Sequence, residues 1–172
     1  MRTAILATLA LASLASLVGL AHADDGPPGD SDRQDKGVFG MGIVLGEPTG
    51  ICAKLYLADD RAIAAAVGSA FIGGGIQATA DYLFHPYILQ KRDAFVVPFY
   101  VGPGVRAIEY RGSESHPALG VRVVAGILFD FKNDVPLDAF MEAAVVIEEG
   151  FGKNGGGAGA AVNAGAGVRY YF

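Results

Sequence analysis

Apolar and polar residues alternate along most of the chain after residue 36, and the pattern is clearest in the last thirteen residues, 160–172. Every second residue counted back from Phe172 is apolar, whereas the intervening residues are small or polar and include Asn163 and Arg169. A period of two places the two sets on opposite faces of a β-strand. The segment is longer than an average globular strand and suits a tilted strand that crosses a bilayer.

Alternation recurs in seven earlier segments that are separated by turn residues, although it is weak at residues 62–71, where alanines dominate. The predicted strands cover residues 38–45, 51–58, 62–71, 76–84, 95–110, 119–129, 137–148 and 160–172. A tight turn is expected at residues 47–50, His85-Pro86 is expected to end the fourth strand, and residues 90–93 are expected to form a solvated loop. An even number of alternating segments joined by short turns is typical of an antiparallel barrel.

The predicted fold class is therefore all-β, an eight-stranded antiparallel up-and-down transmembrane β-barrel. Its last strand must pair with its first to close the barrel. Pro98 and Pro103 lie inside the fifth predicted strand, where each lacks a backbone N–H. A β-bulge is expected near residues 102–104, and Glu109 falls on the outward phase of that strand.

The charges are concentrated on one face of the predicted strands, where most of the other residues are Gly and Ala. They are Lys54, Asp81, Arg106, Arg122, Asp138, Glu142 and Arg169. Small residues between opposite charges suit the crowded interior of an eight-stranded barrel better than a water-exposed sheet. Because buried charges must be paired, we predict an internal network of salt bridges that fills a polar lumen and leaves no open channel.

Aromatic residues near the strand ends are expected to form interfacial girdles on the apolar face. They are Phe39, Phe71, Tyr82, Phe84, Phe95, Phe129, Tyr170 and Phe172. The main alternative interpretation is a soluble periplasmic β-barrel that binds a small apolar ligand and carries the charges on its outside.

The first 23 residues have the pattern of a cleavable secretory signal peptide. Arg2 is followed by an apolar run that ends at the small-residue site Ala21-His22-Ala23. Residues 24–36 are acidic and almost free of apolar side chains, which predicts a disordered leader. The barrel domain is therefore expected at residues 37–172.

The net charge argues against one class of function, and the cysteine content excludes an internal disulfide. Removal of residues 1–23 removes one basic residue and no acidic residue, so 12 basic and 18 acidic residues remain and the net charge is about −6. This balance argues against nucleic-acid binding, which needs a basic surface. Cys52 is the single cysteine of the chain, so it cannot form an internal disulfide.

Three stretches resemble a known family. The residues Gly-Ile-Val-Leu-Gly-Glu-Pro-Thr-Gly at 42–50, Ala-Asp-Tyr-Leu-Phe-His at 80–85 and Gly-Val-Arg-Tyr-Tyr-Phe at 167–172 are similar to segments of an uncharacterised outer-membrane β-barrel family with a GEPTG hairpin. The whole pattern resembles the small outer-membrane β-barrels of Gram-negative bacteria, of the OmpA/OmpX shape. The resemblance implies an outer-membrane location and a signal for the barrel-assembly machinery at Tyr170 and Phe172. It implies no activity.

Candidate catalytic residues are few. Ser113-Glu114-Ser115-His116 allows a membrane-embedded lipid hydrolase as a third hypothesis, although neighbouring residues in one loop do not hold a nucleophile and a base in fixed geometry. No metal-binding motif is present, and no cofactor is expected. We predict a monomeric outer-membrane protein with a structural or interaction role, in contact with outer-membrane lipid and without catalysis.

Overall fold

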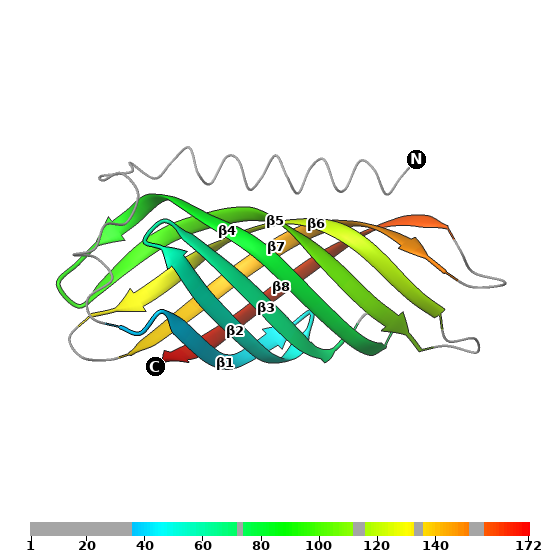
Figure 1. The fold of residues 1–172 in the computed structure, drawn as a ribbon, viewed down its shortest axis with the longest axis horizontal. Coiled ribbons are helices and arrows are strands. Elements are labelled where there is room, and N and C mark those ends of the chain that lie inside the picture. Colours follow the sequence, from blue (N-terminus) through cyan, green and yellow to red (C-terminus); the bar gives the residue numbers. More distant parts are fainter. Residues whose placement is uncertain (1–35, 72–73, 112–115, 133–135, 152–156) are drawn as a thin grey trace.

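The chain folds into one closed ring of eight antiparallel strands (Figure 1). The computed structural model describes residues 36–71, 74–111, 116–132, 136–151 and 157–172. The strands are β1 (Phe39–Gly46), β2 (Thr49–Ala58), β3 (Arg61–Ser69), β4 (Gly75–Lys91), β5 (Phe95–Tyr110), β6 (His116–Phe131), β7 (Leu137–Gly150) and β8 (Ala158–Tyr171). Each strand pairs with its neighbours in sequence, and the described residues contain no helix.

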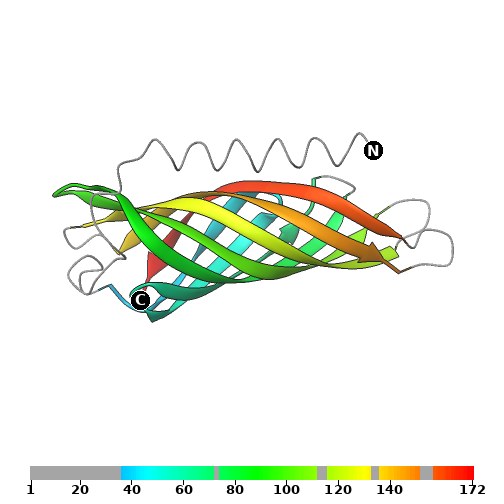
Figure 2. The same cartoon turned by 90° about the horizontal axis from the view of Figure 1, so that it is seen from above.

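The seam between the first and last strands closes the ring. The β1–β8 register runs from Gly40 opposite Tyr171 to Gly46 opposite Gly165. The prediction of eight antiparallel strands that close through the first and last is therefore confirmed. Figure 2 shows the same strands wrapping around one axis when the molecule is turned by 90°.

The two ends of the ring differ. Both the start of β1 and the end of β8 lie at one end, where the Phe172 N–H donates to the Phe39 carbonyl oxygen at 3.0 Å. We call this the terminal end, and the opposite end, where β1 turns into β2, the far end.

Among the described residues, no helix is long and apolar enough to cross a membrane.

The strands differ in length, and the ring is strongly staggered. β1, β2 and β3 have 8, 10 and 9 residues, whereas β4 has 17 and β8 has 14. A path that steps from each strand to the next through paired residues returns to β1 about ten residues away from its starting point. This displacement is the stagger of the ring. As a result, the β1–β2 hairpin stops short of the other strands at the far end, and the β4–β5 hairpin projects at the terminal end (Figure 1).

Strand β4 differs from the sequence-based expectation. It continues through Pro86 to Lys91 and contains two register shifts against β5, between Phe84 and Tyr87 and between Ile88 and Gln90. The predicted strand end at His85-Pro86 and the predicted bulge near residues 102–104 are both wrong. The proline is tolerated because it lies within the first of these register shifts, where the ladder to β5 is interrupted. On the other side, β3 pairs with β4 only as far as Arg61 opposite Phe84, and the His85 N–H donates to the Asp60 carbonyl oxygen.

The β1–β2 turn is short and fixed by local contacts. Gly46 has a φ of 132°, a conformation that glycine adopts easily, and the Glu47–Pro48 peptide bond is cis. The Thr49 hydroxyl accepts from the Gly46 N–H at 2.9 Å and donates to the Gly46 carbonyl at 3.0 Å. The turn therefore places the Glu47 side chain at the far end of the ring.

Candidate functional site

The candidate site is the interior of the ring, where polar and charged side chains are buried along its length. At the far end lies the guanidinium of Arg106 on β5. Its Nε donates to Gln77 Oε1 at 2.9 Å and its Nη1 donates to Glu148 Oε2 at 2.6 Å. Glu47 Oε1 lies 3.8 Å from its Nη2, and the Tyr110 hydroxyl donates to the other oxygen of Glu148. Three strands and one turn are thereby tied together.

A second cluster occupies the middle of the ring. The Arg122 guanidinium on β6 lies between two carboxylates, with Nε 3.0 Å from Asp81 Oδ1 on β4 and Nη2 3.3 Å from Glu142 Oε1 on β7. The hydroxyl of Tyr100 on β5 donates to Glu142 Oε2 at 2.9 Å. One cation is therefore paired with two acids from non-adjacent strands across the lumen.

Lys54 lies among aromatic rings and a histidine. Its Nζ is 2.9 Å from the Tyr56 hydroxyl and 2.9 Å from His85 Nε2, and it sits over the Tyr56 ring at 4.4 Å from the centroid. The His85 Nδ1 lies 3.3 Å from the Asp60 carbonyl oxygen in the β2–β3 turn. A cation over an aromatic face gains electrostatic stabilisation when it is removed from water.

A third charged cluster lies at the terminal end of β7 and β8. Asp138 accepts from Arg169 Nε at 3.0 Å and from the Tyr171 hydroxyl at 2.6 Å. The Arg169 guanidinium lies 4.0 Å from the centroid of the Phe140 ring. At the opening of the ring, the Lys36 ammonium is paired with Asp130 and donates to the Leu137 carbonyl at 3.1 Å. Lys36 was predicted to belong to the disordered leader; the rest of that segment and the predicted signal peptide lie outside the described residues.

Inward-facing glycines make room for the large lumen side chains. A Cβ added to Gly126 would lie 2.5 Å from the Tyr100 hydroxyl oxygen, and one added to Gly167 would lie 2.6 Å from the Phe140 ring. Neither distance is sterically allowed. At these two positions, a residue without a side chain is therefore required by the size of the residue paired with it on the adjacent strand.

The structure brings together part of the predicted charge set. Arg122 meets Asp81 and Glu142, and Arg169 meets Asp138. Arg106 meets none of the predicted acids; its partners are Glu47 and Glu148.

Several lumen residues were missed by the sequence-based reasoning. Glu148 lies an even number of residues from Asp138 and Glu142 on the same strand. The alternation alone could therefore have placed it in the predicted charge network. Glu47 lies on a turn, where periodicity carries no information, and His85 was assigned to the end of a strand. The inward tyrosines Tyr56, Tyr100, Tyr110 and Tyr171 carry hydroxyls that complete the clusters.

Some buried polar atoms have no hydrogen-bond partner among the described residues. They are Gln77 Nε2, Arg122 Nη1, Asn163 Oδ1 and Arg169 Nη2, among others. Buried polar groups of this kind are normally satisfied by ordered water. Protein groups alone therefore do not saturate the lumen.

The remaining sequence-based candidates for chemistry lie only partly within the described residues. Ser113, Glu114 and Ser115 of the hydrolase hypothesis lie outside the described residues, and His116 packs its ring 5.4 Å from that of Tyr110. No cluster of three or more His, Cys, Asp or Glu residues able to hold a metal ion is found in the described part of the chain. Tyr170 is 48% exposed and Phe172 is 71% exposed, with ring centroids 5.1 Å apart at the terminal end.

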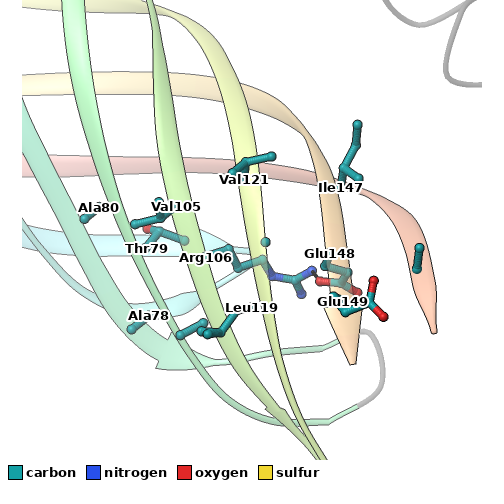
Figure 3. Close-up of a pocket in the computed structure, with 13 residues that line it drawn as sticks. Ala78, Thr79, Ala80, Val105, Arg106, Leu119, Val121, Ile147, Glu148 and Glu149 are labelled. Carbon is teal, nitrogen blue, oxygen red and sulfur yellow. Dashed lines mark hydrogen bonds and ion pairs between the residues drawn. The ribbon is translucent and has the colours of Figure 1, made fainter. Parts of the chain in front are cut away.

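A shallow groove crosses the outer surface from β4 to the start of β8 near the far end (Figure 3). Its volume is about 560 Å³, and small residues such as Ala78, Ala80 and Ala107 line it beside Leu119 and Val121. Figure 3 shows Arg106 directed toward Glu148, its ion-pair partner in the lumen.

No protein-family model, no curated protein and no solved structure matches the chain.

Proposed function

We propose that the protein is an outer-membrane β-barrel of a Gram-negative bacterium that spans the bilayer with a filled polar lumen and has a structural or interaction role. The observation that supports this most directly is the reversal of the usual arrangement of side chains. Arg106, Arg122 and Arg169 are 2–3% exposed, whereas Val121 and Ile147 are 63% and 62% exposed. Soluble proteins bury the apolar residues and expose the charged ones.

The outward face carries a continuous uncharged band. In the described strands, the outward-facing charges lie at or next to strand ends, at Arg61, Lys91, Glu109 and Glu149. On β7 the outward residues from Leu137 to Ile147 are all apolar. About ten intervals of about 3.3 Å, tilted by about 40°, give a band about 25 Å high. Transmembrane barrels have an apolar band of this height.

Aromatic side chains mark one border of this band. Near the terminal end, four outward aromatic residues lie at or next to the ends of their strands, and a fifth, Phe84, lies within β4 opposite the first residue of β3; the four are Phe39, Phe95, Phe131 and Tyr170. Their positions suit a girdle at the periplasmic membrane interface, where aromatic rings are favoured. At the far end, exposed Phe71 and Phe151 follow β3 and β7.

The lumen supports a structural role over transport. Two ion pairs cross the interior between non-adjacent strands, Arg106–Glu148 and Arg122–Asp81, and a third, Arg169–Asp138, joins the adjacent strands β8 and β7. These side chains occupy the space that a channel would need. An eight-stranded barrel is just wide enough to be filled in this way. The resemblance to outer-membrane barrels, the predicted signal peptide and the terminal Tyr170 and Phe172 further suggest export and insertion by the barrel-assembly machinery.

Two measurements on the full chain test the proposal. After expression in a Gram-negative host, the mature protein should be recovered with the outer-membrane fraction. In detergent, the unheated protein should migrate differently from the boiled protein on a gel, because a closed barrel stays folded until heated. Recovery in the soluble periplasm would instead favour the small-ligand-binding barrel and would refute the membrane span.

A further inference from the structure

The far-end part of β8 has a strand on one side only. β7 pairs with β8 up to Ala158, whereas β1 pairs with it only as far as Gly165, opposite Gly46. The last bond on the β1 side joins the Glu47 N–H to the Ala164 carbonyl at 2.9 Å. Residues 158–163 therefore form an open sheet edge among the described residues, above the short β1–β2 hairpin.

The direction of the free backbone groups follows from the ladder. In a strand, the backbone groups of alternate residues point to the same side. Since the Ala164 carbonyl points toward β1, the N–H and C=O groups of Val162 and Ala160 also point to the open side. Val162 is 49% exposed, and Ala158 and Ala160 are also exposed. The edge is therefore accessible and presents donors and acceptors in strand geometry.

A second open edge in the same molecule is protected. At the terminal end β4 runs beyond the start of β3, and its unpaired stretch contains Pro86, two register shifts and a final Lys91. Proline, bulges and lysine are the features by which sheet edges avoid pairing with other chains. The β8 edge, with the sequence Ala-Gly-Ala-Ala-Val-Asn, has none of them.

One exposed acid, Glu149, lies beside the β8 edge, and two further acids, Glu148 and Glu47, lie nearby with their side chains largely buried in the lumen. Ala158 is paired with exposed Glu149, Gly159 is paired with Glu148, and Glu47 lies where the β1 pairing ends. The cation nearest to these acids, Arg106, is buried and contacts both Glu47 and Glu148. Arg111, another described cation at this end, lies beside Gly74 after β5. Small residues at 158–161 leave the carboxylate of Glu149 uncovered.

We propose that the β8 edge at residues 158–163 binds an extended, basic segment of a partner protein by β-strand addition. The partner backbone would hydrogen-bond to Ala160, which is paired with Ile147 at the border of the apolar band, and to Ala158, which lies beyond that border and presents its backbone groups to the same side. The Lys or Arg side chains of the partner would approach Glu149. Main-chain bonds supply affinity in this mode of recognition, and side chains supply selectivity. The inference rests on the ring topology, and only its assignment to the cell exterior rests on the proposed function.

The test uses the full chain folded in detergent and a fluorescein-labelled decapeptide of alternating Lys and Thr, with binding followed by fluorescence anisotropy. Ala160→Pro removes one N–H from the open side and blocks the edge, but it leaves the β7 ladder intact, because that ladder uses Gly159 and Ala161. Ala160→Val is the matched control, since it keeps the N–H group. We expect at least a tenfold loss of affinity with the proline and little change with the valine.

Two probe controls separate strand addition from simple charge attraction. The same peptide with N-methyl groups at alternate residues keeps its charge but cannot form the ladder, so it should bind at least tenfold more weakly. A Glu/Thr decapeptide should also bind at least tenfold more weakly, and Glu149→Gln should reduce the affinity for the lysine peptide.

The proposal is overturned if the lysine peptide does not bind, if Ala160→Pro binds it like the wild type, or if the N-methylated peptide binds equally well. It is also overturned if sedimentation shows a wild-type dimer that Ala160→Pro dissociates, since the edge would then belong to a second copy. The heat-dependent gel shift of Ala160→Pro reports the barrel separately, so failure of this proposal and failure of the membrane span can be distinguished.

Discussion

The stability of the fold should depend strongly on the contacts between the buried guanidinium of Arg122 and its two carboxylate partners. Its side chain is 2% exposed and lies within ion-pair distance of Asp81 and Glu142. A buried charge that loses its partners costs several kcal/mol, because neither water nor another group compensates it. Single substitutions of charged lumen residues should therefore lower the free energy of unfolding more than substitutions in the turns.

Reversal of the charge at Arg122 tests this directly. Arg122→Glu would place a third carboxylate beside Asp81 and Glu142, and we expect it to lower the free energy of unfolding by about 3–5 kcal/mol or to prevent folding. Urea unfolding in lipid vesicles, followed by the gel shift, measures the effect. Lys132→Glu, in the half-buried position after β6, is the control and should change stability by no more than about 0.5 kcal/mol. Equal effects of the two reversals would show that the assignment of Arg122 to the lumen is wrong.

The Arg169–Asp138 pair should show coupling in a double-mutant cycle. Arg169→Met and Asp138→Leu each leave a buried charge alone, so each is expected to cost about 3–5 kcal/mol. The double variant removes both charges and should be more stable than the sum of the two single losses predicts, by about 0.5–3 kcal/mol. Strictly additive losses in urea unfolding would mean that the two side chains do not interact in the folded protein.

At the scale of the element, inward-facing glycines leave room for large side chains on the adjacent strand. Gly126 on β6 lies against the hydroxyl end of Tyr100, and Tyr100 in turn donates to Glu142. An added methyl group would displace the tyrosine and weaken the central cluster.

The loss of stability on substitution of an inward-facing glycine should therefore depend on the size of the side chain next to it. Gly126→Ala is expected to destabilise the protein by about 1–3 kcal/mol, the usual range for overpacking. Gly159→Ala is the matched control, because its Cβ would meet only the Glu148 Cγ at 3.9 Å. If both variants unfold at the same urea concentration, the lumen is less crowded than the structure shows.

The elements were largely predictable, and the contacts between them were not. A period of two identifies strands and their faces without knowledge of neighbours, so β5 was predicted with its observed ends and the β1–β8 closure followed from the strand count. The partners of Arg106 depend on cross-strand register, which periodicity does not specify. The passage of β4 through Pro86 depends on the register shift of β4 against β5, a tertiary property that the local sequence cannot show.

At the scale of the whole molecule, stagger and unequal strand lengths leave two open edges among the described strands, and the charged clusters fill the interior of the ring. A filled interior implies that ions do not cross. In planar lipid bilayers, the full chain should therefore give no stable current steps at moderate voltage. Reproducible ohmic conductance would contradict the filled lumen, even if the membrane span itself were correct.

The central claim is that the outward apolar face contacts lipid. The chain contains no tryptophan, so a single one introduced at an outward position reports without background. Val123 lies in the middle of β6 and is 59% exposed. In vesicles, the fluorescence of Val123→Trp should be quenched by lipids brominated in the acyl chains and protected from aqueous iodide. Quenching by iodide without quenching by brominated lipid would show that this face lies in water, and would contradict the account.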